Sequence, residues 1–189
     1  AARRGLETAR ETVANILGCD ASEVIFTSGG TEANNLALFG LADRDRGPGH
    51  LVASLIEHPA VASPVARLEA LGWTLGRPEV DPSGVIHSDT FLNTIRSETR
   101  FATLMLANNE TGAIQRVGEI ARLLADRGVP VHTDAVQAVG RIPVDFHDLG
   151  VATLAASAHK FHGPGGVGLL LVRAGTRLAP RIFGGGPDR

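Results

Sequence analysis

Residues 155–172 are AASAHKFHGPGGVGLLLV and contain Lys160, the only lysine among the 18 basic residues of the chain. The apolar runs 151–156 and 167–172 on either side predict two strands, and the glycines and proline of residues 163–166 predict a bend between them. A lysine at the end of a buried strand is poorly solvated, which favours a neutral amine, whereas arginine keeps its charge. The stretch therefore predicts one nucleophilic amine suited to Schiff-base formation. The alternative from this stretch alone is a solvated lysine in a surface loop.

The composition is typical of a globular protein with one core. The chain has 189 residues, of which 43% are apolar and 20% are charged. No apolar run reaches the ~20 residues that span a bilayer and no signal peptide is recognisable, so we expect a cytoplasmic protein without membrane partners. The net charge of -2 and the scarcity of aromatic residues argue against a nucleic-acid surface. The single Cys19 cannot form an internal disulfide, and we expect it to be a packed or tolerated loop thiol.

Helices and strands are predicted to alternate along the chain. Residues 1–17 predict an amphipathic helix that ends before Gly18. Its apolar residues at helical spacing are Leu6, Ala9, Val13 and Ile16. Further strands are expected at residues 24–27, 50–56, 101–107 and 129–133, with a short one between residues 73 and 100. Further helices are expected at residues 32–38, 59–71, 89–95 and 117–127. This alternation predicts an α/β fold with a largely parallel sheet and right-handed crossovers.

The turn after residues 24–27 is Ser28-Gly29-Gly30-Thr31, and a predicted helix follows it. This order is typical of a phosphate cradle, because the N–H groups of the first helical turn and the helix dipole face the ligand. Glycine turns also join strands to helices in many α/β proteins that bind no phosphate. The turn lacks the spacing of a Walker loop and of a dinucleotide fingerprint.

Other polar residues follow the later predicted strands. His58 could stack on an aromatic ring or move a proton, or it could cap the helix that begins there. Asp134 could serve a ligand as a buried acid, or it could cap a following helix. His159 and His162 lie in a glycine-rich bend without a neighbouring carboxylate or thiol, so we expect no metal site.

Each of these polar groups lies at the carboxyl end of a predicted strand. In α/β sheets, ligands bind at this edge. Together they offer a phosphate cradle, a flat stacking group, an acid, amides and one nucleophilic lysine. That combination fits pyridoxal 5'-phosphate (PLP), which carries a phosphate, a pyridine ring and an aldehyde. We therefore expect PLP as the cofactor.

Five segments in chain order resemble cysteine desulfurases, most closely the group that serves iron-sulfur cluster assembly, within the class V aminotransferase family of fold-type I. They are FTSGGTEANNLA at 26–37, EHPAV at 57–61, NNETG at 108–112, HTDAVQ at 132–137 and SAHKFHGPGGVG at 157–168. The resemblance covers essentially the whole chain. It implies a three-layer, mostly parallel sheet flanked by helices, with residues 1–189 forming a PLP-binding large domain.

The resemblance also implies roles for single residues. Lys160 and His58 would be catalytic, with Lys160 forming the Schiff base and His58 stacking on the pyridine ring and assisting proton transfer. Asp134 would pair with the ring nitrogen. Asn109 and Gln137 would contact the phenolic oxygen or its surroundings. The phosphate would be held by Gly30, Thr31, Ser157 and His159. The implied reaction converts L-cysteine to L-alanine and transfers the sulfur to an acceptor.

The chain departs from the family pattern at its ends. In the family, the sulfur-accepting cysteine and the arginine that binds the substrate carboxylate lie beyond the position of Arg189, and Cys19 does not match that cysteine. From the resemblance we also expect that the chain lacks an N-terminal segment and the C-terminal small domain of the family, and that it is a fragment that is inactive by itself. Residues 183–189 resemble the start of a segment that contacts the phosphate of the neighbouring subunit. The resemblance therefore implies a homodimer, and a sulfur-acceptor or scaffold protein as a further partner.

Two alternatives stay open. One is another class V PLP enzyme, such as an aminotransferase or a selenocysteine or cysteine-sulfinate lyase, which needs the same cofactor site but no nucleophilic cysteine. The other is a non-catalytic remnant that folds or dimerises without turnover.

Overall fold

The structure is a computed structural model that describes residues 2–43 and 47–184, so part of the closing segment 183–189 lies outside the described residues. The described strands form one sheet of seven strands in the order β1-β7-β6-β5-β4-β2-β3. Their bounds are β1 Val24–Thr27, β2 His50–Ala53, β3 Thr74–Gly76, β4 Thr99–Thr103, β5 Val131–Asp134, β6 Thr153–Ser157 and β7 Gly168–Val172. Strands β2 to β6 pair in parallel, whereas β7 is antiparallel to both β1 and β6. The predicted α/β fold with a mostly parallel sheet is confirmed.

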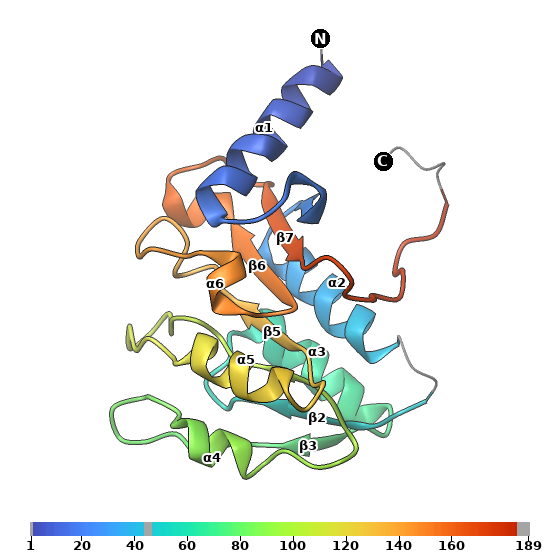
Figure 1. The fold of residues 1–189 in the computed structure, drawn as a ribbon, viewed down its shortest axis with the longest axis vertical. Coiled ribbons are helices and arrows are strands. Elements are labelled where there is room, and N and C mark those ends of the chain that lie inside the picture. Colours follow the sequence, from blue (N-terminus) through green and yellow to red (C-terminus); the bar gives the residue numbers. More distant parts are fainter. Residues whose placement is uncertain (1, 44–46, 185–189) are drawn as a thin grey trace.

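Helices cover both faces of this sheet and give the three expected layers (Figure 1). One face carries α2 (Gly30–Ala42) and α3 (Pro59–Ala70), and the other carries α4 (Ser88–Leu92), α5 (Val117–Ala125) and α6 (Phe146–Leu149). Large side chains such as Phe91, Ile120 and Phe146 fill the core on the α5 side, and Leu38 and Leu68 pack on the α2 side. Among the described residues, no helix combines the length and apolar character needed to cross a membrane.

Helix α1 (Ala2–Leu17) forms where the sequence predicts it but packs through a different side. Ala14 and Leu17 are buried, whereas Leu6 and Ile16 of the predicted apolar face are 48% and 71% exposed. Figure 1 shows the reason, because the helix projects beyond the sheet and only its last turns reach the other elements. Helical spacing therefore finds this helix without showing which side meets the domain.

Strands β2 and β4 end a few residues earlier than predicted, at Ala53 and Thr103. These two residues are paired with each other, so beyond Thr103 the chain has no strand neighbour on that side. The backbone N–H of Met105 instead donates to Glu57 Oε1 at 2.9 Å. Residues 104–107 nevertheless stay buried, and an apolar pattern cannot show where such a strand ends.

The remaining predicted elements agree with the structure within a few residues. Strands β5 and β6 are displaced toward the carboxyl side, so Asp134 and Ser157 are themselves the last residues of strands. Lys160 lies in a short 3-10 helix, η2 (Ala158–Phe161), where the sequence suggested an open bend. Helix α6 and a second 3-10 helix, η1 (Ala21–Glu23), were not predicted from the sequence.

Candidate functional site

A pocket of about 220 Å³ is lined by residues that lie at or just beyond the carboxyl ends of β1, β2, β4, β5 and β6. All nine residues singled out from the sequence line it: Gly30, Thr31, His58, Asn109, Asp134, Gln137, Ser157, His159 and Lys160. The other lining residues are Asn34, Ala60, Met105 and Val136. Parallel strands end at one edge of a sheet, which is why residues from distant parts of the chain meet here.

One side of the pocket is formed by the start of α2. The first helical hydrogen bond runs from Ala33 N to Gly29 O at 3.1 Å, so the amides before Ala33 are left for other partners. Gly30 is buried, and a Cβ atom at this position would lie only 2.7 Å from Val136 Cγ2. Glycine is therefore needed here to leave space between the helix and the β5 turn. Amides at a helix start, next to hydroxyl groups, are suited to binding an anion.

Asp134 supplies a carboxylate that is 4% exposed. Its Oδ1 accepts from Val136 N at 2.9 Å, and its Oδ2 accepts from Asn34 Nδ2 at 2.7 Å. Burial raises the pKa of Asp134, while these two hydrogen bonds and the nearby His58 and Lys160 act in the opposite direction. No helix follows Asp134 directly, so the helix-cap alternative is wrong and the bond to Val136 closes a turn instead.

His58 is exposed at the start of α3 and also borders the pocket. Its Nδ1 accepts from Ala60 N at 3.1 Å, so it caps the helix as one of the two sequence interpretations predicted. In the neutral ring this bond leaves the proton on Nε2. Capping therefore fixes the ring at the pocket edge, and the two interpretations of His58 are compatible.

Lys160 and Ser157 stand at the end of β6. Lys160 is half-buried, so its surroundings are less enclosed than the sequence suggested. Ser157 is buried, and its Oγ lies 2.9 Å from Nδ1 of the exposed His159. The end of β6 thus brings one amine, one hydroxyl and one imidazole to the same pocket.

Asn34 was not predicted as a site residue, but it is fully buried on α2 and hydrogen-bonded to Asp134. Its position one helical turn after Gly30 and one before Leu38, both on the buried side of α2, was a usable signal. A polar residue on the buried side of a helix needs a partner, and a carboxylate is a strong one.

Glu57 was also missed, although it lies in a quoted motif directly before His58. Its Oε1 accepts from Ser54 Oγ at 2.8 Å and from Met105 N at 2.9 Å. Its Oε2 is enclosed and has no hydrogen-bond partner among the described residues. Burial raises the pKa of Glu57 to about 8, the hydrogen bond from Ser54 opposes this shift, and the charge of Asp134 adds to it. Nothing in the sequence indicates this contact with the segment that follows β4.

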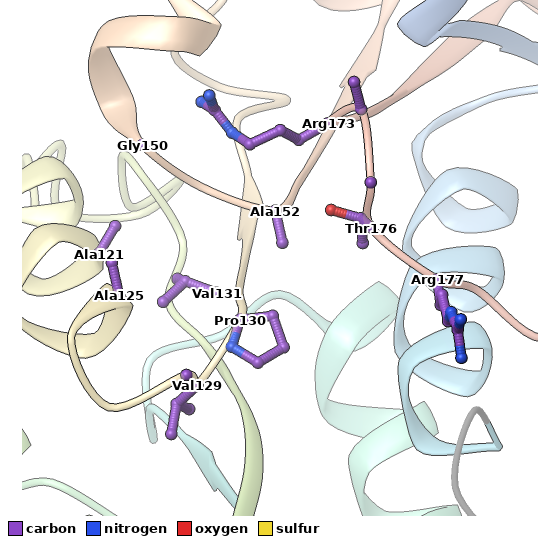
Figure 2. A pocket seen from close by; sticks show the side chains of 13 residues that line it. Ala121, Ala125, Val129, Pro130, Val131, Gly150, Ala152, Arg173, Thr176 and Arg177 are labelled. Atoms are coloured by element: carbon purple, nitrogen blue, oxygen red, sulfur yellow. The ribbon is translucent and has the colours of Figure 1, made fainter.

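A larger hollow of about 540 Å³ lies near the amino-terminal ends of β5 and β6 (Figure 2). Val129, Pro130 and Ala152 line it, and its lining contains no acid, histidine or lysine. Arg173 borders it, but its Nε donates to Val151 O at 2.8 Å. This hollow therefore lacks the reactive groups that the smaller pocket contains.

Cys19 precedes β1, at the end of that strand opposite the pocket. Burial raises the pKa of Cys19 to about 11, and the charges of Glu23, Asp20 and Asp145 add to the shift. A thiol with such a pKa is protonated at neutral pH and is a poor nucleophile. This agrees with the predicted role of a packed loop thiol.

Near Cys19, Asp20, Glu23 and His147 have ligand atoms within 4.8 Å of one another. Both oxygens of the buried Glu23 are already bonded, since Oε1 accepts from Ala174 N at 2.7 Å and Oε2 accepts from Asp20 N at 2.9 Å. His147 Nε2 lies 2.7 Å from the same Oε2. These bonds join η1, α6 and the end of β7, which is a structural role.

Residues 1–188 match the family described as "Aminotransferase class-V". The chain is 43% identical over 187 residues to "Cysteine desulfurase IscS" of Dictyoglomus turgidum, a match covering 98% of this chain and 48% of that protein. It is 40% identical over 189 residues to "Cysteine desulfurase IscS" of Methanosarcina thermophila, covering 99% and 46%. The chain thus spans about half the length of the curated relatives it matches.

Solved structures give the same result. The structure titled "SspA in complex with cysteine" has a TM-score of 0.93 and 36% identity, and the match covers 98% of this chain and 55% of that one. A second, titled "NIFS-LIKE PROTEIN", has a TM-score of 0.93 and 37% identity, covering 98% and 52%. Identities above 30% over nearly the whole chain relate these proteins in sequence as well as in fold.

Proposed function

The chain belongs to the aminotransferase class-V family, and from this premise we propose that it is the PLP-binding large domain of a cysteine desulfurase. In this proposal L-cysteine is the substrate, L-alanine is the product and the sulfur passes to an acceptor. The observation that carries the proposal is the pocket itself, in which the only lysine of the chain lines the same cavity as Asp134, His58 and the start of α2.

The pocket residues fit PLP, the cofactor of class V enzymes. Hydrogen bonds oppose the unfavourable burial of the Asp134 carboxylate, and a cationic ring nitrogen beside it would stabilise its charge further. The phosphate-binding space at the start of α2 requires glycine at position 30, because a Cβ atom on Gly30 would lie 2.7 Å from Val136 Cγ2. The phosphate would bind at the α2 start, with groups from Gly30, Thr31, Ser157 and His159. Asn109 and Gln137 border the space for the ring oxygen.

When bound, PLP supplies an aldehyde that condenses with amines and a ring that takes up electrons released at the substrate Cα. Lys160 would hold the cofactor and then accept the Cα proton on Nζ. His58 would stack on the ring, because capping α3 fixes its orientation, and would move a proton through Nε2. Asp134 would keep a proton on the ring nitrogen through its opposite charge.

The choice of cysteine as substrate rests on the relatives named above, two of which are called cysteine desulfurases. The related SspA structure contains cysteine, according to its title. Cys19 is remote from the pocket and its pKa is raised to about 11, so the sulfur would have to be taken by another thiol. We further propose a homodimer in the cytoplasm that delivers sulfur to an acceptor or scaffold protein for iron-sulfur cluster assembly.

The first experiment tests whether the chain binds PLP covalently. The chain is incubated with PLP, reduced with borohydride and digested, and the adduct is located by mass spectrometry. We expect it on Lys160. The Lys160→Arg variant is a sharp control, because it has no lysine left and any remaining adduct must be at the N-terminus. Tight PLP binding without modification of Lys160 would overturn the assignment. Absence of binding would favour the non-catalytic alternative.

A second measurement addresses the substrate class. L-Cysteine added in D2O should lose its Cα proton to solvent, which NMR detects as deuterium at Cα, while the Lys160→Arg variant should show no exchange. With an added thiol to accept the sulfur, alanine as the product supports a desulfurase. A keto acid as the product would support an aminotransferase instead.

A further inference from the structure

Behind Asp134 lies a row of buried polar side chains that the proposed mechanism does not use. Asn34 Nδ2 donates to Asp134 Oδ2 at 2.7 Å, and Asn34 Oδ1 lies 2.9 Å from His132 Nε2. His132 Nδ1 in turn lies 2.8 Å from Thr153 Oγ1. Asn34, His132 and Thr153 are all 0% exposed. The row joins α2, β5 and β6, and it ends at the pocket.

Each hydrogen in this row has only one consistent position. An ionised carboxylate can only accept, so Asn34 must turn its NH2 group toward Asp134 and its carbonyl oxygen toward His132. His132 must then donate through Nε2, and in a neutral ring Nδ1 must accept from the Thr153 hydroxyl. Burial lowers the pKa of His132 to about 3, which agrees with a neutral ring.

The consequence concerns the charge on Asp134. Burial favours the protonated carboxyl, and the donor from Asn34 is one of the groups that oppose this effect. Asn34 donates to Asp134 through its NH2 group while its oxygen accepts from the His132 ring. Without His132 this oxygen would be buried without a donor, which would loosen the amide and weaken the hydrogen bond that it gives to Asp134.

We propose that Asn34 and His132 are positioning residues that keep the Asp134 carboxylate ionised and oriented before the cofactor arrives. The pocket is then preorganised for a protonated ring nitrogen. This inference rests on the proposed function, because it assumes that Asp134 meets that nitrogen. Thr153 completes the row by fixing the tautomer of His132.

The first experiment measures PLP affinity by equilibrium dialysis in Asn34→Leu and His132→Leu. Loss of a hydrogen bond to a charged group corresponds to about a 10- to 100-fold weaker affinity. The ring nitrogen of 15N-labelled PLP should also lose its proton at lower pH in both variants, which a merely structural role would not cause. Affinity and nitrogen protonation equal to those of the unchanged protein would overturn the proposal.

His50 offers a matched control. It is also 0% exposed, and its Nδ1 lies 2.8 Å from a strand threonine, Thr99 Oγ1, but it stands at the start of β2 and does not line the pocket. His50→Leu should lower the stability of the fold and leave PLP affinity unchanged. An equal loss of PLP affinity in His50→Leu would show that the effect of His132→Leu is one of general destabilisation.

Coupling to the carboxylate is tested in the Asp134→Asn background. If Asn34 acts through the charge of Asp134, adding Asn34→Leu to Asp134→Asn should weaken PLP binding much less than Asn34→Leu does alone. If Asn34→Leu weakened PLP binding by the same factor in both backgrounds, this result would contradict the proposal.

One measurement needs no variant and no cofactor. In 15N-histidine NMR of the unchanged chain, His132 should be a neutral ring with its proton on Nε2 from pH 5 to 8. A proton on Nδ1, or a charged ring at pH 7, would refute the order of donors and acceptors from Thr153 to Asp134, even if the variants did not fold. Because this result is independent of PLP, its failure differs from failure of the proposed function, which is the absence of a borohydride-stable adduct on Lys160.

Discussion

The buried carboxyl of Glu57 should make the stability of this fold fall as pH rises through neutrality, and Glu57→Gln should abolish that fall. Burial raises the pKa of Glu57 from 4.5 to about 8. The native state therefore keeps a proton that the unfolded chain has lost, so stability declines between these two pKa values and levels off above about pH 8.

The magnitude follows from the two pKa values. Full linkage corresponds to about 1.4 kcal/mol per pH unit, and the slope becomes smaller close to pH 8. From pH 6.5 to 8 the contribution of Glu57 to the free energy of unfolding should thus fall by about 1.5 kcal/mol. The buried His50 and His132, whose pKa values are lowered, change stability mainly below pH 6.5, and they are common to both proteins.

The assay is urea unfolding at several pH values, followed through fluorescence of the single Trp73, which is 6% exposed in the native state. Relative to Glu57→Gln, the unchanged protein should lose about 1.5 kcal/mol between pH 6.5 and 8. Glu11→Gln is the control, because Glu11 is exposed on α1. Parallel stability curves for the unchanged protein and Glu57→Gln would refute the argument that Glu57 is protonated in the fold.

Three further outcomes are expected. Gly30→Ala should weaken PLP binding at least about tenfold, because its Cβ would lie 2.7 Å from Val136 Cγ2. Gly5→Ala has open space around it and should leave the affinity unchanged, and equilibrium dialysis measures both variants. Cys19 should react with iodoacetamide at pH 8 about 100-fold more slowly than a thiol of pKa 9, and it should carry no persulfide after incubation with PLP and cysteine; a cysteine-dependent persulfide there would contradict its placement. Asp134→Asn should retain covalent PLP but lose exchange of the cysteine Cα proton in D2O, and undiminished exchange would exclude the proposed role of the carboxylate.

The sequence alone predicted the α/β fold and nine of the thirteen residues that line the pocket. Alternating strands and helices predict parallel pairing, and the carboxyl ends of parallel strands lie at one edge. For that reason Asp134, Ser157 and Lys160 could be expected at one place without coordinates, and they do line one pocket. The single lysine added a chemical argument that does not depend on the fold at all.

The tertiary structure alone decided how these residues are held. Asn34 meets His132 and Asp134 across about a hundred positions of sequence, and Glu57 reaches Met105 because β2 and β4 both end at the paired residues Ala53 and Thr103. Periodicity and turn chemistry report local conformation, which is set by near neighbours in the chain. Hydrogen-bond partners, burial and the resulting pKa shifts depend on which elements pack together, and that is fixed only when the sheet and its helices assemble.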